Sequence, residues 1–247
     1  MKRPAVSSSQ KKALAGLLEF VSGIGRKKRP VVVFDLDDTL LSTDRRHLRI
    51  LSEFAAQADV RRRDPRGAAA LSKLKESRVR YSVTETAQAA GLTDSALLAA
   101  LKSFWFERFF TNEYLLADHP VPGAAEYCAA ALQAGARVVY MTGRDEGMRR
   151  GTEASLKNWN FPRPDGRRIR PIRKSSFGLP DLEYKRDNMA AIRALGVVAG
   201  SFENEPAHIN IFHDSFPEAW HFQVETKHSG RPIEALPGTR RIADFRR

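Results

Sequence analysis

Three carboxylates stand close together directly after an apolar run of the sequence. Asp35, Asp37 and Asp38 follow PVVVF (30–34), in a chain whose formal net charge is +12. Like charges at this spacing repel one another, so positive charge is expected nearby. Carboxylates placed in this way can act as nucleophiles, transfer protons or ligate a hard cation. The sequence therefore indicates chemistry at this turn, with a cation beside it.

Other polar residues follow the remaining apolar runs or begin the helices between them. They are Thr142, Gly143 and Arg144 at the end of VVYMTGR, Lys185 near the start of a predicted helix over 183–194, and Glu203, Asn204 and Glu205 after VVAGSF (197–202). In parallel α/β sheets, ligands bind at the carboxyl ends of the strands. We therefore expect these side chains to lie near the three carboxylates and to form one site.

The strands that would position this site alternate with helices. The β-branched run VVVFDL (31–36) is typical of a strand buried on both faces of a parallel sheet. Further strands are predicted over 138–142, 168–173, 197–202 and 220–226, and helices over 10–22, 123–134, 146–158, 183–194 and 206–215. This alternation predicts an α/β fold with a doubly wound, mainly parallel, Rossmann-like sheet.

Between the first two strands the pattern becomes purely helical. Helices are predicted over 45–58, 67–77, 84–90 and 93–110, and the aromatic residues at the end of the last one are expected to form a core between these helices. The predicted organisation is an N-terminal helix and basic linker (1–29), an α/β core (30–43 and 119–247) and an inserted α-helical cap subdomain (44–118).

Composition limits the class of protein and its partners. A hydrophobic content of 42% with 28% charged residues describes a globular chain, and no apolar run approaches the roughly 18 residues of a membrane span. Glu19 interrupts the apolar N-terminal segment, which is not read as a signal peptide, so a cytoplasmic location is expected. The single cysteine, Cys128, excludes an intramolecular disulfide and is predicted to be a packing thiol.

The positive charge favours anionic ligands, which include phosphate esters and nucleic acids. Basic clusters occur at 25–30, 61–66 and 167–174, and none is interleaved with the aromatic residues of a single-strand binding platform. A nucleic-acid partner is therefore compatible with the sequence but is not indicated by it.

The ordered motifs resemble those of the haloacid dehalogenase (HAD) superfamily over roughly residues 30–226, including a helical insertion similar to a C1-type cap. They are D-x-D-x-T at Asp35–Thr39, an apolar strand ending at Thr142, a lysine near a helix start at Lys185, and a strand ending in acids at Glu203 and Glu205. In the fourth motif this chain has Glu-Asn-Glu where the superfamily usually has a pair of aspartates.

The resemblance implies a Mg²⁺-dependent phosphomonoester hydrolase of the phosphatase type. Asp35 would be the nucleophile that forms an aspartyl-phosphate, and Asp37 would be the general acid and base. Mg²⁺ would bind Asp35, the backbone carbonyl of Asp37 and Glu203. Thr142 and Lys185 would hold the phosphoryl oxygens. Gly143 and Arg144 are further candidates for contacting the substrate phosphate; Arg144 could also contact the leaving group, or pair instead with a nearby acid. An acid at position 37 disfavours dehalogenation within this superfamily.

Several alternatives stay open from the sequence. Glu203 is preferred as the metal ligand, with Glu205 or Asp214 as competitors and Asn204 in a supporting role; Asp214 would qualify only if 209–213 were the strand. Asp38 either orients the loop or Lys185, or is a solvated loop residue. The preferred substrate is a small phosphorylated metabolite. The alternatives are a nucleotide or nucleic-acid-end phosphatase and a non-catalytic phospho-ligand-binding domain. The oligomeric state cannot be predicted.

Overall fold

The computed structural model describes residues 6–247, which fold as two units. The first unit extends to Leu41 and continues over Pro120–Glu146 and Leu156–Arg247, and the second comprises Ser42–His119 and Gly147–Ser155. Within the described chain, no helix is long and apolar enough to cross a membrane. The cytoplasmic location and the function of the helical insertion as a cap stay predictions.

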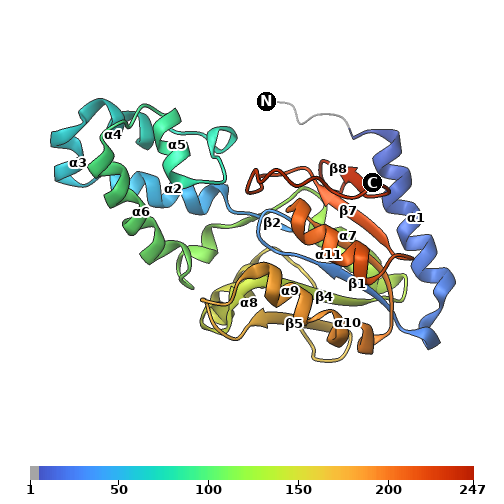
Figure 1. The fold of residues 1–247 in the computed structure, drawn as a ribbon. Coiled ribbons are helices and arrows are strands. Elements are labelled where there is room, and N and C mark those ends of the chain that lie inside the picture. Colours follow the sequence, from blue (N-terminus) through green and yellow to red (C-terminus); the bar gives the residue numbers. More distant parts are fainter. Residues whose placement is uncertain (1–5) are drawn as a thin grey trace. The chain divides into compact units, whose positions relative to one another are not determined.

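A six-stranded sheet in the order β5-β4-β1-β6-β7-β8 forms the centre of the first unit, and all neighbouring strands are parallel (Figure 1). The strands are β1 (Pro30–Phe34), β4 (Arg137–Asp145), β5 (Ile169–Lys174), β6 (Val197–Glu203), β7 (Trp220–Val224) and β8 (Arg240–Ile242). The chain first adds strands on one side of β1 and then on the other. This order confirms the predicted doubly wound α/β fold and places the switch point beside β1.

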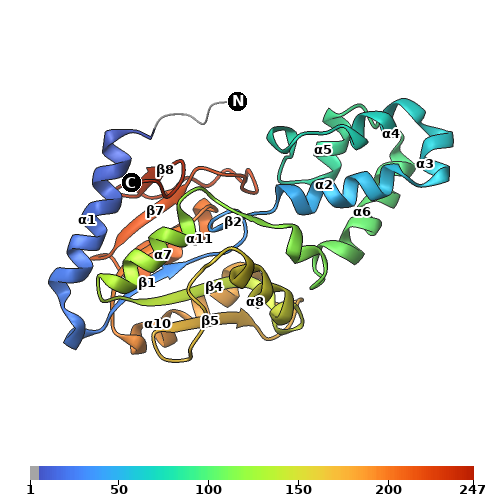
Figure 2. The same cartoon turned by 180° about the vertical axis from the view of Figure 1, so that it is seen from behind.

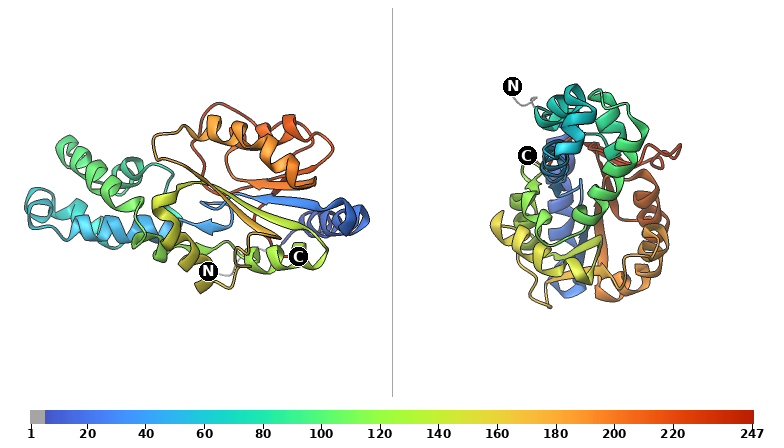
Figure 3. Two further views of the ribbon diagram at one scale, coloured as in Figure 1. Left: turned by 90° about the horizontal axis from the view of Figure 1, so that it is seen from below. Right: turned by 90° about the vertical axis from the view of Figure 1, so that its left-hand side faces the viewer.

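Helices cover both faces of this sheet, because successive side chains of each strand point to opposite faces. Val32 and Phe34 pack against α1 (Ser8–Ile24) and α7 (Ala124–Gln133), whereas Val31 and Val33 face α9 (Asp181–Asp187), α10 (Met189–Leu195) and α11 (Pro206–Ser215). Figure 2 shows α7 in front of the sheet, and the left view of Figure 3 shows α11 on the opposite side from α7. The fully buried β1 explains why its sequence is a continuous apolar run.

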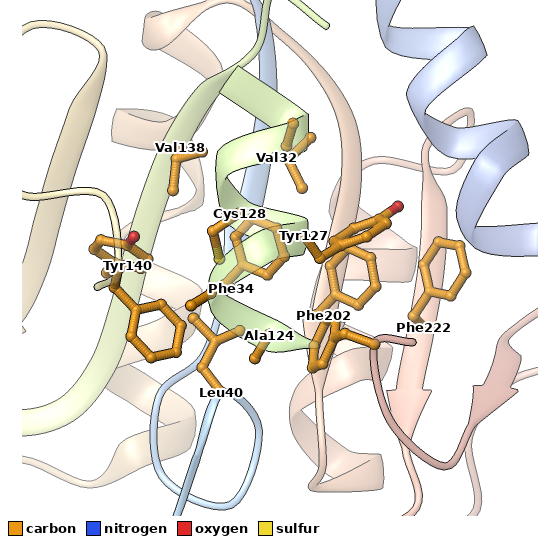
Figure 4. Close-up of a cluster of buried hydrophobic side chains, with 14 of the residues drawn as sticks. Val32, Phe34, Leu40, Ala124, Tyr127, Cys128, Val138, Tyr140, Phe202 and Phe222 are labelled. Atoms are coloured by element: carbon orange, nitrogen blue, oxygen red, sulfur yellow. The ribbon is translucent and has the colours of Figure 1, made fainter. Parts of the chain in front are cut away.

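Stacked aromatic rings fill the core on the α7 side (Figure 4). The ring of Phe202 stacks on Phe34 and on Phe222, with centroid distances of 4.8 Å and 4.5 Å. Cys128 is fully buried in the same cluster, and burial raises the pKa of its thiol. This thiol is therefore inert and contributes to packing.

The second unit is built from helices around its own apolar core. They are α2 (Asp44–Ala55), α3 (Ala58–Arg63), α4 (Pro65–Ser72), α5 (Val83–Ala89) and α6 (Ser95–Phe109). Asp64 caps α4 by accepting a hydrogen bond from the Gly67 backbone N–H at 2.7 Å, and Asp94 caps α6 in the same way. Short acceptor side chains thus set where these helices begin.

The remaining elements are short or belong to connections. They are β2 (Leu41–Ser42) paired with β3 (His119–Pro120), α8 (Arg149–Asn158), and the 3₁₀ helices η1 (Arg26–Lys28), η2 (Glu76–Arg78), η3 (Tyr114–Ala117) and η4 (Glu146–Met148).

The structure differs from the predicted elements in several places; among them, the predicted helix 67–77 ends at Ser72, and β4 extends beyond 138–142 to Asp145. The predicted helix 45–58 ends at Ala55, and α3 follows it as a separate helix because Gln57 is extended. The predicted helix 183–194 is divided into α9 and α10 at Asn188, whose side-chain amide donates to the Tyr184 carbonyl at 2.8 Å. The short, arginine-rich strand β8 was not predicted.

A buried histidine should make the stability of the first unit depend on pH. His221 accepts a hydrogen bond from Ser201 at 2.8 Å through Nδ1, and its Nε2–H donates to the Phe216 carbonyl at 2.9 Å. Burial lowers the pKa of His221 from 6.5 to about 4. Between these values the unfolded chain binds more protons than the folded one, so stability falls as the pH is lowered, by about 3 kcal/mol across the window.

Thermal unfolding at about pH 7 and about pH 5 measures this effect. We expect the Tm of the wild type to drop more between the two conditions than the Tm of His221→Gln, which cannot take up the proton. An equal drop in the two proteins would assign the pH dependence to other groups.

Candidate active site

The site lies where three adjacent strands end. In the sheet, Phe34 of β1 is level with Tyr140 of β4 and with Phe202 of β6. The next residue, Asp35, continues this pairing because its backbone N–H donates to the Phe202 carbonyl at 3.0 Å. The parallel register therefore brings Asp35, Thr142 and Glu203 to the same edge of the sheet.

Lys185 of α9 joins two of the candidate acids. Its Nζ is 3.0 Å from Oδ1 of Asp35, and it also pairs with a carboxylate oxygen of Glu203. The other oxygen of Glu203 accepts hydrogen bonds from the backbone N–H groups of Asn204 and Glu205, at 3.1 Å and 3.2 Å. All three charged side chains are buried, with exposures of 9% or less. These contacts define an Asp35–Lys185–Glu203 cluster.

The charges in this cluster are not balanced, since two carboxylates share one ammonium. Burial and the repulsion from Glu203 raise the pKa of Asp35 to about 8, against the attraction of Lys185. Burial also opposes ionisation of Glu203, but Lys185 and His208 outweigh it and hold its pKa at about 2. Burial would lower the pKa of Lys185, but the two acids outweigh it and raise that pKa. The cluster can therefore accommodate further positive charge.

The donor set suits a Mg²⁺ ion. Within residues 6–247, no group of three or more His, Cys, Asp or Glu side chains is arranged to hold a metal. Mg²⁺, however, commonly takes only one or two carboxylates and completes its coordination with water and substrate phosphate. The buried carboxylates of Asp35 and Glu203, which share one ammonium, fit that requirement.

Asp37 has a different partner from Asp35. The guanidinium of Arg144 makes a bidentate contact with its carboxylate, with Nε and Nη2 each 2.8 Å from an oxygen. The Arg144 side chain is 1% exposed and that of Asp37 is 33% exposed. The Arg144 backbone N–H donates to Oγ1 of Thr142 at 3.2 Å. The carboxylate of Asp37, the candidate acid/base, is thus partly exposed and pairs with the buried guanidinium of Arg144.

The last residues of β4, which continues past Thr142 to Asp145, lie against the start of α9. A Cβ atom at Gly143 would lie 2.9 Å from Oδ1 of Asp181, so glycine permits this approach without a shift of the Asp181 side chain. Asp181 also pairs with Lys174, and the neighbouring Arg173 donates to Glu146 at 2.9 Å. Two cations of β5 are thereby paired with acids at the start of α9 and directly after β4.

The three candidate acids of the fourth motif, Glu203, Glu205 and Asp214, differ in the residues that they contact. Glu205 accepts hydrogen bonds from the backbone N–H and the hydroxyl of Ser229, at 2.8 Å and 2.7 Å. Segment 209–213 is helical, and Asp214 is exposed in the last turn of α11. Asp214 therefore lies about 12 Å along the helix from its first residue, Pro206. Among the three acids, Glu203 alone contacts Lys185.

Asp38 and Asn204 contact the segment that follows β7. Lys227 Nζ is 2.9 Å from Oδ1 of Asp38, and Asn204 donates to the Lys227 carbonyl at 2.5 Å. Lys227 and Ser229 were not among the site residues predicted from the sequence. Their position near the site could still have been predicted from the strand over 220–226. This strand, β7, pairs in parallel with β6, so its carboxyl end must lie at the same edge of the sheet.

Comparison with known proteins shows which family model and which solved structures this chain is similar to. The family model for haloacid dehalogenase-like hydrolases matches residues 30–157. A putative haloacid dehalogenase-like hydrolase from Bacteroides fragilis is similar in structure, with a TM-score of 0.52, 13% identity, and coverage of 88% of this chain and 98% of that chain. No curated protein sequence matches the chain.

Two further solved structures are similar. A HAD-superfamily hydrolase of subfamily IA from Geobacter sulfurreducens gives a TM-score of 0.50 at 12% identity, covering 90% of this chain and 95% of that chain. The protein CbbY from Rhodobacter sphaeroides, in complex with phosphate, gives 0.49 at 17% identity, covering 87% and 94%. At identities of 12–13%, the two structures with TM-scores of 0.50 and 0.52 show a shared fold and nothing further.

Proposed function

The chain belongs to the haloacid dehalogenase-like hydrolases, and we propose that within this family it is a Mg²⁺-dependent phosphomonoester hydrolase. The observation that carries the proposal is the buried Asp35–Lys185–Glu203 cluster. In it the potential nucleophile Asp35 pairs with the ammonium of Lys185, and Asp35 and Glu203 share that single cation. Fold alone does not choose between the reactions of a family. The carboxylate of Asp37, two residues from the nucleophile, supports phosphoryl transfer over dehalogenation because it can handle protons.

In the proposed first step, a carboxylate oxygen of Asp35 attacks the phosphorus of the ester. The bond from phosphorus to the ester oxygen breaks, and Asp37 donates its proton to that oxygen. The products of this step are an aspartyl-phosphate and the alcohol. Thr142 and Lys185 would hold the phosphoryl oxygens during the transfer.

In the second step, Asp37 takes a proton from a water molecule that attacks the phosphorus. The bond between phosphorus and the Asp35 oxygen breaks, which releases inorganic phosphate and restores the Asp35 carboxylate and the protonated Asp37. One group thus acts first as an acid and then as a base.

The contact between Arg144 and Asp37 adds a requirement to the first step. Asp37 cannot present a proton to the substrate while both of its oxygens accept from Arg144. We therefore propose that Arg144 exchanges Asp37 for a phosphoryl oxygen when the substrate binds, since a guanidinium forms bidentate pairs with carboxylates and with phosphates. This exchange would give Arg144 the phosphate-binding role expected from the sequence.

Asp35, Glu203 and the backbone carbonyl of Asp37 would hold Mg²⁺, which supplies positive charge to the transferring phosphoryl group. We expect Mg²⁺ to raise the Tm of the metal-free protein, and to do so more strongly as the pH rises towards about 8. The folded-state pKa of Asp35 is raised far above its ordinary value of 3.8. Metal-free stability therefore falls as the pH rises through this window, and bound Mg²⁺ offsets that loss.

Calorimetry with and without Mg²⁺ at several pH values measures this prediction. The Glu203→Gln variant should lose most of the Mg²⁺-dependent shift, whereas Glu205→Gln should keep it, because Glu205 is engaged by Ser229. A Tm that ignores Mg²⁺ in the wild type, or an unchanged shift in Glu203→Gln, would contradict the assigned metal site.

For the substrate, we propose a small phosphorylated metabolite, with the inserted helical segment 44–118 acting as a C1-type cap that selects it. Hydrolysis of an aryl phosphate with Mg²⁺, followed by a panel of phosphorylated metabolites, tests the activity. Phosphate release supports the proposal. Halide release from a 2-haloacid without phosphate release would overturn it, and so would binding of phosphate esters with no turnover under any divalent cation, the behaviour of a non-catalytic binder.

A nucleotide or nucleic-acid-end phosphatase is the second candidate, and a group of cations in the second unit favours it. Six basic side chains between residues 61 and 80 are exposed, and none makes an ion pair with another residue of the described chain; they are Arg61, Arg66, Lys73, Lys75, Arg78 and Arg80. Such a group attracts polyanions. Oligonucleotide binding that weakens steeply with salt would support this candidate, and no binding at low salt would remove it.

A further inference from the structure

We infer that Lys227 is a positioning residue that fixes the loop carrying Asp35 and Asp37, by holding Asp38 in a left-handed backbone conformation. Lys227 belongs to the segment 226–229, which follows β7 and connects the loops after β1 and β6. This inference rests on the proposed function for its effect on turnover, but the contacts themselves are properties of the fold.

The backbone of Asp38 needs support. Its φ angle is +56°, and it is one of three non-glycine residues in the described chain with a positive φ. Such a conformation is unfavourable for a residue with a Cβ atom, although aspartate tolerates it when its polar groups find hydrogen bonds. Both the backbone carbonyl and the side-chain carboxylate of Asp38 have partners. Thr226 donates to the carbonyl, and Lys227 pairs with the carboxylate at 2.9 Å.

The segment 226–229 is itself anchored to the loop after β6. Asn204 donates to the Lys227 carbonyl at 2.5 Å, and the backbone and hydroxyl of Ser229 donate to Glu205 at 2.8 Å and 2.7 Å. Thr39 completes the connection by donating to the Asn204 side-chain oxygen at 3.1 Å. Three loops from adjacent parallel strands are thereby joined in a closed set of hydrogen bonds.

This arrangement can set the geometry of the reaction. Asp37 and Asp38 share a peptide plane, so any rotation of the Asp38 backbone moves the carboxylate proposed as the acid/base. Displacements of about 1 Å at a reacting group can lower a rate by about 100-fold. Lys227 also neutralises Asp38, whose charge would otherwise add to those of Asp35 and Asp37. Lys227 therefore acts through Asp38, with which its ammonium pairs.

A glycine at position 38 provides the test, because glycine adopts positive φ without help from a partner. We expect Lys227→Met to lower kcat by about 10-fold or more with little change in KM, the pattern for misplaced catalytic groups. In the Asp38→Gly background the same Lys227→Met change should have little further effect. Arg231→Met, which removes a cation from the same loop away from Asp38, should behave like the wild type.

Thermal unfolding of each variant verifies that it is folded in the assay. The inference is overturned if Lys227→Met leaves kcat unchanged, or lowers it equally in the wild-type and Asp38→Gly backgrounds. It is also overturned if the main effect is a raised KM that Arg231→Met reproduces, which would make Lys227 part of a general attraction for the anionic substrate. Absence of turnover in the wild type would instead overturn the proposed function.

Discussion

Replacing Asp35 with asparagine should lower phosphomonoester turnover by at least about 10³-fold, because the amide cannot form the acyl-phosphate bond on which both steps depend. The variant should remain folded. Asparagine has the same size, and its amide oxygen can still accept from Lys185, which lies 3.0 Å from the Asp35 carboxylate. It also removes a carboxyl group whose ionisation is disfavoured in this buried site, as the raised pKa of Asp35 indicates. Initial rates with an aryl phosphate and Mg²⁺ measure the loss.

The matched control is Asp214→Asn, which makes the same chemical change at an exposed position of α11. It should retain the wild-type rate. Asp214 was a competing metal ligand from the sequence. This control therefore also tests whether Glu203 or Asp214 is the metal-binding acid of the fourth motif. Activity that persists in Asp35→Asn, or is lost in Asp214→Asn, would contradict the assigned nucleophile or metal site.

The largest stability effect is expected at a buried ion pair in the second unit. Arg46 of α2 donates from Nε and Nη2 to the two oxygens of Asp118, at 2.8 Å and 2.5 Å, and both side chains have no exposed surface. Its guanidinium also lies 4.2 Å from the centroid of the Phe109 ring. Removing one partner leaves a buried charge without compensation, so Arg46→Met should destabilise this unit by about 3–5 kcal/mol.

Urea unfolding followed by circular dichroism measures this effect. Arg49→Met on the same helix is the control, because the Arg49 side chain is 37% exposed and pairs with exposed glutamates. That change should alter stability by less than about 1 kcal/mol. Adding Asp118→Leu to Arg46→Met should recover much of the loss, since two apolar side chains replace the pair. Equal effects of the two single changes would show that burial of the pair is unimportant.

Local patterns were sufficient to predict the main features of the fold. The apolar run before Asp35 predicted a strand covered on both faces, and β1 is buried along its whole length. The helical spacing of Ile209, Phe212 and Phe216 after Pro206 favoured a helix there, and α11 confirms it. The rule that strand ends converge also predicted that Asp35, Thr142 and Glu203 would lie at one edge of the sheet.

Interactions between distant parts of the sequence could not be predicted in this way. Arg144 lies 107 residues from Asp37, and Arg46 lies 72 residues from Asp118, so no periodicity relates either pair. The choice between Glu203 and Glu205 also required the structure, because both residues follow the same strand and only their partners distinguish them. Similarly, nothing local indicated that Gly147–Ser155 belongs to the helical unit.

We propose above that the phosphoryl group is transferred to Asp35 and forms a covalent intermediate there. Asp37→Asn is the variant with which to capture it, since it keeps the nucleophile but removes the base of the second step. The variant is mixed with an activated aryl phosphate and Mg²⁺, quenched in acid and digested for mass spectrometry. We expect one added phosphoryl group, labile to hydroxylamine, on the peptide containing Asp35. Turnover by the wild type, with no such adduct in the variant or with an adduct on another residue, would contradict the proposed intermediate.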